Sequence, residues 1–205
     1  RTDIPLEKNI ELAEKYRSKY KVPVKVELIL GLPGNTLDSF YEEMDLFAKF
    51  DSWFWPRNLF NVLPDTEAAD PSYQMKYKMV VVDAGIMENE EQDVTCISNS
   101  VISMFRSNTR LAVESYSFSK EEYKEMFFMN RAQRILGPLV PPDKNAGTEL
   151  RKAFSKIKTL PWYSDIDEWL NKLVNGELPS QDVNLIDGKV IEDHVKENLG
   201  SINGF

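Results

Sequence analysis

The stretch that most constrains this chain lies at residues 24–37, where an apolar segment, a glycine turn and a helical pattern follow one another. Residues 24–30 are mostly apolar with β-branched members, which predicts a strand buried on both faces in a parallel sheet. Gly31 and Gly34 bracket a tight turn, because glycine adopts backbone conformations that other residues resist. Asn35 or Thr36 is expected to cap a helix that reaches residue 50. Its apolar residues recur at helical spacing: Leu37, Phe40, Tyr41, Met44, Phe47 and Ala48.

A second strand is predicted at residues 57–64, which Pro64 closes. Strand, helix and strand in succession favour a (β/α) repeat with parallel strands. In such folds the turn after a strand lies at the carboxyl end of the sheet, where ligands bind. The loop before the second strand holds aromatic residues that suit either a buried core or the wall of a substrate cavity: Trp53, Phe54 and Trp55.

Two of these segments resemble motifs of one enzyme family. Residues 31–36 read GLPGNT, which is similar to the GLPGET segment of radical S-adenosylmethionine (SAM) enzymes. Residues 63–73 read LPDTEAADPSY and resemble the LPNTPLADP…Y segment of the subgroup that carries an N-terminal cobalamin-binding domain. One helix of suitable length joins the two motifs, and a weaker likeness continues to about residue 137. Asn35 departs from the family pattern, and a plain turn that binds nothing is the simplest alternative for the first motif.

The resemblance implies an α/β fold, namely the C-terminal half of a partial (β/α) TIM-like barrel followed by a mainly α-helical C-terminal extension. It divides the chain into barrel strands and helices at 1–72, a post-barrel extension at 73–140 and a helical tail at 141–205. By the same resemblance, Ile29, Gly31 and Leu32 would pass the adenine ring of SAM. The next strand would line the other side of that ring through Asn61, Val62 and Leu63. No residue is assigned a catalytic role.

The family binds its [4Fe–4S] cluster through the thiolates of a C-x-x-x-C-x-x-C loop, whereas this chain has only Cys96. The resemblance therefore implies a C-terminal segment of a radical SAM Fe–S oxidoreductase or methyltransferase. The full-length protein would bind SAM, the cluster and, in one version, cobalamin, and this fragment would retain none of them. Its partners would be the missing N-terminal part of the same protein and a small-molecule substrate. The alternative is a non-catalytic α/β module that binds a nucleotide or a partner.

Composition limits the partners, metal sites and cellular compartment that we expect for this chain. Lys+Arg 25 against Asp+Glu 33 gives a net charge of −8, which disfavours direct binding of nucleic acid. A single cysteine forms no intramolecular disulfide, and we expect a cytoplasmic protein in which Cys96 is buried. No apolar run approaches the ~20 residues of a membrane span. His194 is the one histidine and is expected to be solvated, so no ordinary transition-metal site is predicted. The open edge of half a barrel predicts self-association of the isolated chain.

Local signals predict the other elements. Residues 111–117 alternate like a strand, and Ser119 with Glu122 forms a capping box for a largely buried helix that ends at Gly137-Pro138. A helix is also expected from about residue 4 to residue 20. Residues 140–147 are predicted to be a linker, and residues 94–105 suit either a strand or a helix. Three further helices are expected in the tail, at residues 148–158, 163–175 and 190–198.

Overall fold

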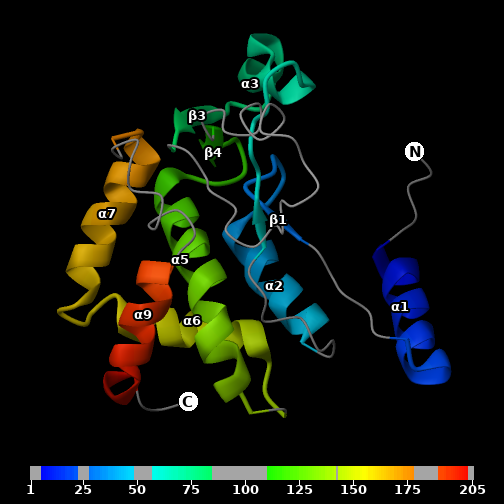
Figure 1. Ribbon diagram of the computed structural model, residues 1–205. Helices are drawn as coiled ribbons and strands as arrows, with labels where there is room; N and C mark the ends of the chain where they lie inside the picture. Colours follow the sequence, from blue (N-terminus) through cyan, green and yellow to red (C-terminus); the bar gives the residue numbers. More distant parts are fainter. Residues whose placement is uncertain are drawn as a thin grey trace, which may run out of the picture.

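The computed structural model describes residues 6–22, 28–48, 57–84, 110–141, 143–177 and 189–202, which form a mainly helical α/β fold (Figure 1). The helices are α1 (Leu6–Tyr20), α2 (Leu37–Phe47), α3 (Pro71–Lys76), α5 (Lys120–Leu136), α6 (Ala146–Ile157), α7 (Tyr163–Asn175) and α9 (Lys189–Glu197). The strands are β1 (Ile29–Leu30), β2 (Asn58–Leu59), β3 (Val80–Asp83) and β4 (Arg110–Glu114). Short 3-10 turns lie at η1 (Glu67–Ala69), η3 (Gly137–Leu139) and η4 (Leu199–Ser201). These residues contain no closed barrel, so the half barrel stays a prediction.

The first two strands are parallel neighbours, which confirms the parallel pairing expected from the strand–helix–strand order. Ile29 pairs with Asn58 and Leu30 with Leu59. The prediction of a strand buried on both faces is wrong for the part of β1 that is described. Leu30 is 1% exposed and joins the core with α2 and α5, whereas Ile29 is 44% exposed. Helices therefore cover one face of the β1–β2 pair, and the other face carries Ile29 in the open.

The other two strands form an antiparallel pair that lies beyond the end of β2. Val80 pairs with Glu114 and Asp83 with Arg110. The strand predicted at 111–117 is confirmed as β4 for residues 111–114, whereas residues 115–117 form a turn, and β3 was not predicted. The chain after β2 joins β4, because the Val62 amide donates to the Arg110 carbonyl at 2.7 Å. A small second core lies between these segments and α3, built on Val62, Met79 and Ala112.

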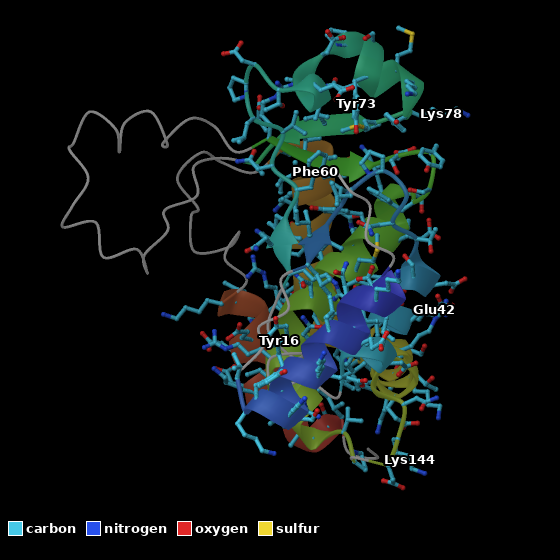
Figure 2. All side chains as sticks on the ribbon, turned by 90° about the vertical axis from the view of Figure 1, so that its right-hand side faces the viewer. Tyr16, Glu42, Phe60, Tyr73, Lys78 and Lys144 are labelled. Atoms are coloured by element: carbon cyan, nitrogen blue, oxygen red, sulfur yellow. The ribbon has the colours of Figure 1, made fainter. Side chains whose placement is uncertain are left out.

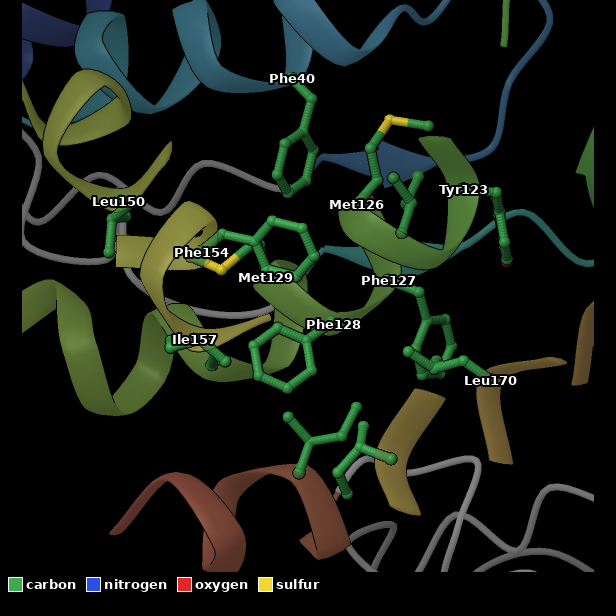
Figure 3. Packing of buried hydrophobic residues seen from close by; sticks show 14 of the residues in the cluster. Phe40, Tyr123, Met126, Phe127, Phe128, Met129, Leu150, Phe154, Ile157 and Leu170 are labelled. Carbon is green, nitrogen blue, oxygen red and sulfur yellow. The ribbon is translucent and has the colours of Figure 1, made fainter. Parts of the chain in front are cut away.

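Helix α5 is the centre of the main hydrophobic core. Its predicted capping box is present, with the Ser119 amide donating to Glu122 Oε2 at 2.8 Å and the Glu122 amide donating to Ser119 Oγ at 3.3 Å. Residues on several of its faces are fully buried, as expected: Tyr123, Met126, Phe127, Phe128 and Met129. Figure 3 shows Phe127 beside Leu170 of α7, and the ring of Phe128 lies 5.6 Å from that of Phe154 in α6. The main hydrophobic cluster thus contains residues from all three predicted segments, 1–72, 73–140 and 141–205. Their division into separate domains stays a prediction.

The tail helices are all present, with two differences from expectation. Helix α6 begins at Ala146, inside the predicted linker, and its Gly147 amide donates to Asp45 Oδ1 of α2 at 2.7 Å. His194 of α9 is half-buried rather than solvated, because its ring lies 6.5 Å from that of Trp162. Its Nδ1 is also 2.9 Å from the Val190 carbonyl oxygen.

Helix α1 ends at Tyr20, as expected of the N-terminal helix, but stands apart from the other elements. In Figure 1 it lies to one side of the body, and in the turned view of Figure 2, where Tyr16 is labelled, it lies in front. Apolar and aromatic side chains on it are about half exposed: Leu12, Tyr16 and Tyr20. None of the helices in the described ranges combines the length and the apolar character needed to cross a membrane.

Candidate functional site

The glycine turn after β1 has the conformation that its sequence predicts. Gly31 has φ 95° and Gly34 has φ 105°, and both values lie in the region that side chains disfavour. Asn35 closes the turn from within, because the Leu32 amide donates to Asn35 Oδ1 at 3.0 Å. The Asn35 amide in turn donates to the Leu32 carbonyl at 2.9 Å. Asn35, which differs from the GLPGET segment, therefore restrains the turn through two hydrogen bonds with Leu32.

The cap of α2 is Thr36, one of the two residues expected there. The Ser39 amide donates to Thr36 Oγ1 at 3.0 Å, and the Thr36 amide donates to Ser39 Oγ at 2.9 Å. The Gly34 amide also has a protein partner, Ser117 Oγ, at 2.9 Å. Since Pro33 has no amide hydrogen, every backbone donor from Leu32 to Thr36 is engaged by the protein. Residues 32–36 therefore offer a phosphate or another anion no free backbone donor, unlike a phosphate-binding loop.

Gly31 is closely surrounded by this chain. A side chain placed there would lie 3.2 Å from the Ala112 carbonyl oxygen of β4 and 3.3 Å from the Tyr123 ring of α5. It would also lie 3.6 Å from Phe60 Cβ, beyond the end of β2. A ligand at the end of β1 would therefore meet the exposed side chain of Ile29 and the half-buried Leu32 rather than the Cα face of Gly31.

The three predicted site residues that follow β2 lie in different surroundings. Asn61 is half-buried, and its Oδ1 accepts a hydrogen bond from the Arg110 amide at 3.0 Å. Val62 is 1% exposed, with its side chain in the small core beneath α3. Leu63 is half exposed. The parallel register brings Ile29, Gly31 and Asn61 to the carboxyl ends of neighbouring strands. Among the predicted site residues, the exposed apolar ones are Ile29 and Leu63.

A buried arginine fixes the start of β2 against two helices. Arg57 donates from Nη2 to the Phe40 carbonyl at 2.9 Å, and its Nε lies 3.3 Å from Glu43 Oε2. Asn130 of α5 binds the Arg57 backbone twice, accepting from its amide at 2.6 Å and donating to its carbonyl at 3.1 Å. Burial lowers the pKa of Arg57 and raises the pKa of Glu43, while their mutual attraction opposes both shifts. This cluster is structural, because its polar groups bind one another.

Sequence reasoning missed the contribution of residues 115–118. Ser117 accepts from Gly34, and the Tyr116 hydroxyl would lie 3.6 Å from a side chain at Gly34. The two serines around Tyr116 were included in a predicted strand, and no local signal connects them with a turn 83 positions away. The aromatic residues 53–55 and Cys96 lie outside the described residues, as does the segment 94–105. The described ranges hold no group of three or more His, Cys, Asp or Glu arranged for a metal ion.

A scan against models of known protein families finds no match to this chain. A search of curated proteins finds no similar protein either.

Proposed function

We propose that this chain is the C-terminal segment of a radical SAM Fe–S oxidoreductase or methyltransferase, and that it supplies the adenine side of the SAM site. The observation that supports the proposal is the parallel pairing of β1 with β2. Each of the two family-like motifs follows one of these strands, at residues 31–36 and 63–73. Because the strands are parallel neighbours, both motifs begin at the same edge of the sheet, as a shared ligand site requires.

The open face of the β1–β2 pair suits the adenosyl part of the cofactor. Ile29 offers an exposed apolar surface on which a planar ring can pack. Asn58, its partner in the register, is also exposed, and its side-chain amide can both donate and accept hydrogen bonds. SAM supplies the reactive adenosyl or methyl group in this family, and the protein positions it.

The iron–sulfur cluster does not fit this chain, because the single cysteine cannot supply its thiolate ligands. In the proposal these ligands belong to the missing N-terminal part of the protein. The half barrel would then be completed by strands from that part, on the side of β1 away from β2. Cobalamin, where used, would also be bound outside this chain.

Titration of the full-length, ¹⁵N-labelled protein with SAM tests the adenine site, because this chain alone is not expected to retain SAM. We expect saturable shifts of the amide signals at residues 29–32 and 61–63. Ile29→Ala removes an apolar contact worth roughly 1–2 kcal/mol and should weaken binding about five- to thirtyfold. Leu12→Ala is the matched control, because Leu12 is 45% exposed, similar to Ile29, and belongs to α1, which lies to one side of the body (Figure 1). Equal affinity in both variants, or no shifts at millimolar SAM, would favour the non-catalytic module instead.

A further inference from the structure

The glycine turn is attached to a second turn that is distant in the sequence. After β4 the chain reverses at residues 115–118, where the Ser115 amide donates to the Phe118 carbonyl at 3.0 Å. Ser117 stands at the tip of this reversal, and its Oγ accepts the Gly34 amide hydrogen at 2.9 Å. This bond joins the turn after β1 to the segment between β4 and α5.

The acceptor on Ser117 is itself held by a neighbouring hydroxyl. Ser115 Oγ lies 2.9 Å from Ser117 Oγ and accepts the Ser117 amide hydrogen at 3.2 Å. Ser115 is buried, whereas Ser117 is half-buried. The two hydroxyls and the Ser117 amide therefore fix the rotamer in which Ser117 Oγ faces Gly34, as serine side chains commonly do in turns.

A packing contact attaches the other end of the glycine turn to the same segment. Phe118 is buried and stacks on Tyr123, with ring centroids 5.9 Å apart and an interplanar angle of 27°. The Tyr123 ring in turn lies 3.3 Å from the position that a side chain would occupy at Gly31. Both glycines are thus held by residues 115–123, one through a hydrogen bond and the other through an aromatic ring.

We propose that Ser117, supported by Ser115, is a positioning residue for the glycine turn and sets the form in which the turn meets the adenosyl group of SAM. This inference rests on the proposed function. It gives the segment after the predicted barrel a part in the cofactor site, because removing the Ser117 hydroxyl releases the Gly34 amide. Asn35 alone then restrains the turn at its tip.

The test compares Ser117→Ala with Ser117→Thr, which keeps the hydroxyl. Ser164→Ala is the control, since the Ser164 hydroxyl donates to the Pro161 carbonyl on an exposed surface and, unlike Ser117, has no contact with the glycine turn. Hydrogen exchange of the Gly34 amide and the Kd for SAM are measured by NMR in the full-length protein, with melting curves alongside. One hydrogen bond predicts roughly a two- to tenfold rise in both exchange rate and Kd for Ser117→Ala. Ser117→Thr should restore both, and Ser164→Ala should change neither.

The outcomes separate the attachment from the proposed function. Unchanged Gly34 exchange in Ser117→Ala would overturn the attachment itself. Faster exchange with an unchanged Kd would leave Ser117 a structural residue and overturn its positioning role. Faster exchange in a chain that binds no SAM would overturn the positioning role together with the proposed function. Faster exchange and weaker binding, both restored by threonine while the melting temperatures stay similar, would support the proposal.

Discussion

Gly147→Ala tests how closely α6 approaches α2. Gly147 lies in the first turn of α6, where a methyl group would overlap the Tyr41 carbonyl oxygen and lie 2.7 Å from the Tyr41 carbonyl carbon. Real Cβ atoms essentially never come within 3.0 Å of such a heavy atom. The contact is with backbone, which cannot rotate away, so the helices must move apart. That movement also lengthens the 2.7 Å hydrogen bond from the Gly147 amide to Asp45 Oδ1.

Opposing effects determine the change in the free energy of unfolding. Alanine is favoured over glycine inside a helix by about 0.5–1 kcal/mol. Overpacking costs about 1–3 kcal/mol, and the weakened hydrogen bond to a carboxylate up to about 1.5–3 kcal/mol more. The clash outweighs the helix preference, so we expect a net loss of about 2–4 kcal/mol. For a chain of this size, the melting temperature should fall by roughly 4–16 °C.

Urea denaturation and thermal melting, both followed by circular dichroism, measure this loss. Gly200→Ala is the matched control, because a side chain at Gly200 would meet nothing within 4 Å. We expect this control to lie within about 0.5 kcal/mol of the wild type. If Gly147→Ala were as stable as the wild type, the close approach of α6 to the Tyr41 carbonyl would be refuted.

Two further predictions concern buried polar groups. Asn130→Ala leaves the Arg57 amide and carbonyl without partners and should cost about 2–5 kcal/mol in urea denaturation. Asn130→Asp keeps an acceptor for the Arg57 amide but turns a buried carboxylate oxygen towards the Arg57 carbonyl, so it should also destabilise the chain. A loss below about 1 kcal/mol for Asn130→Ala would contradict the two-bond arrangement. Burial raises the pKa of Glu125, although the hydrogen bond from Tyr41 opposes this shift. The folded state therefore favours protonated Glu125, so its contribution to stability is complete below about pH 4.3 and is lost as the pH rises through the raised value. As the pH rises through that range, Glu125→Gln should become more stable relative to the wild type. Glu168→Gln, at an exposed glutamate, should show no such gain. A difference in stability between Glu125→Gln and the wild type that does not change with pH would argue against the burial of Glu125.

The elements that were predictable from the sequence depend on neighbours within one or two helical turns. The capping box of Ser119 and Glu122 spans three residues, and α7 has the same bounds as the helix predicted at 163–175. The glycine turn was readable because its positive φ angles demand glycine in any context. In contrast, the apolar run that became β3 was mixed with charged residues, and it is a strand only because β4 pairs with it.

In the candidate site, too, some features were predictable from the sequence and others were not. The sequence by itself determined the turn after β1, its helix cap and the parallel partner strand, because each follows from local propensity and from the order of elements. Only the tertiary structure decided that Ile29 is open while Val62 is buried, since exposure depends on which segments cover each strand. It also decided that Ser117 holds Gly34 and that Gly147 touches α2, through contacts 83 and 102 positions apart. No local pattern encodes such pairs, because they form only when the core around α5 brings distant segments together.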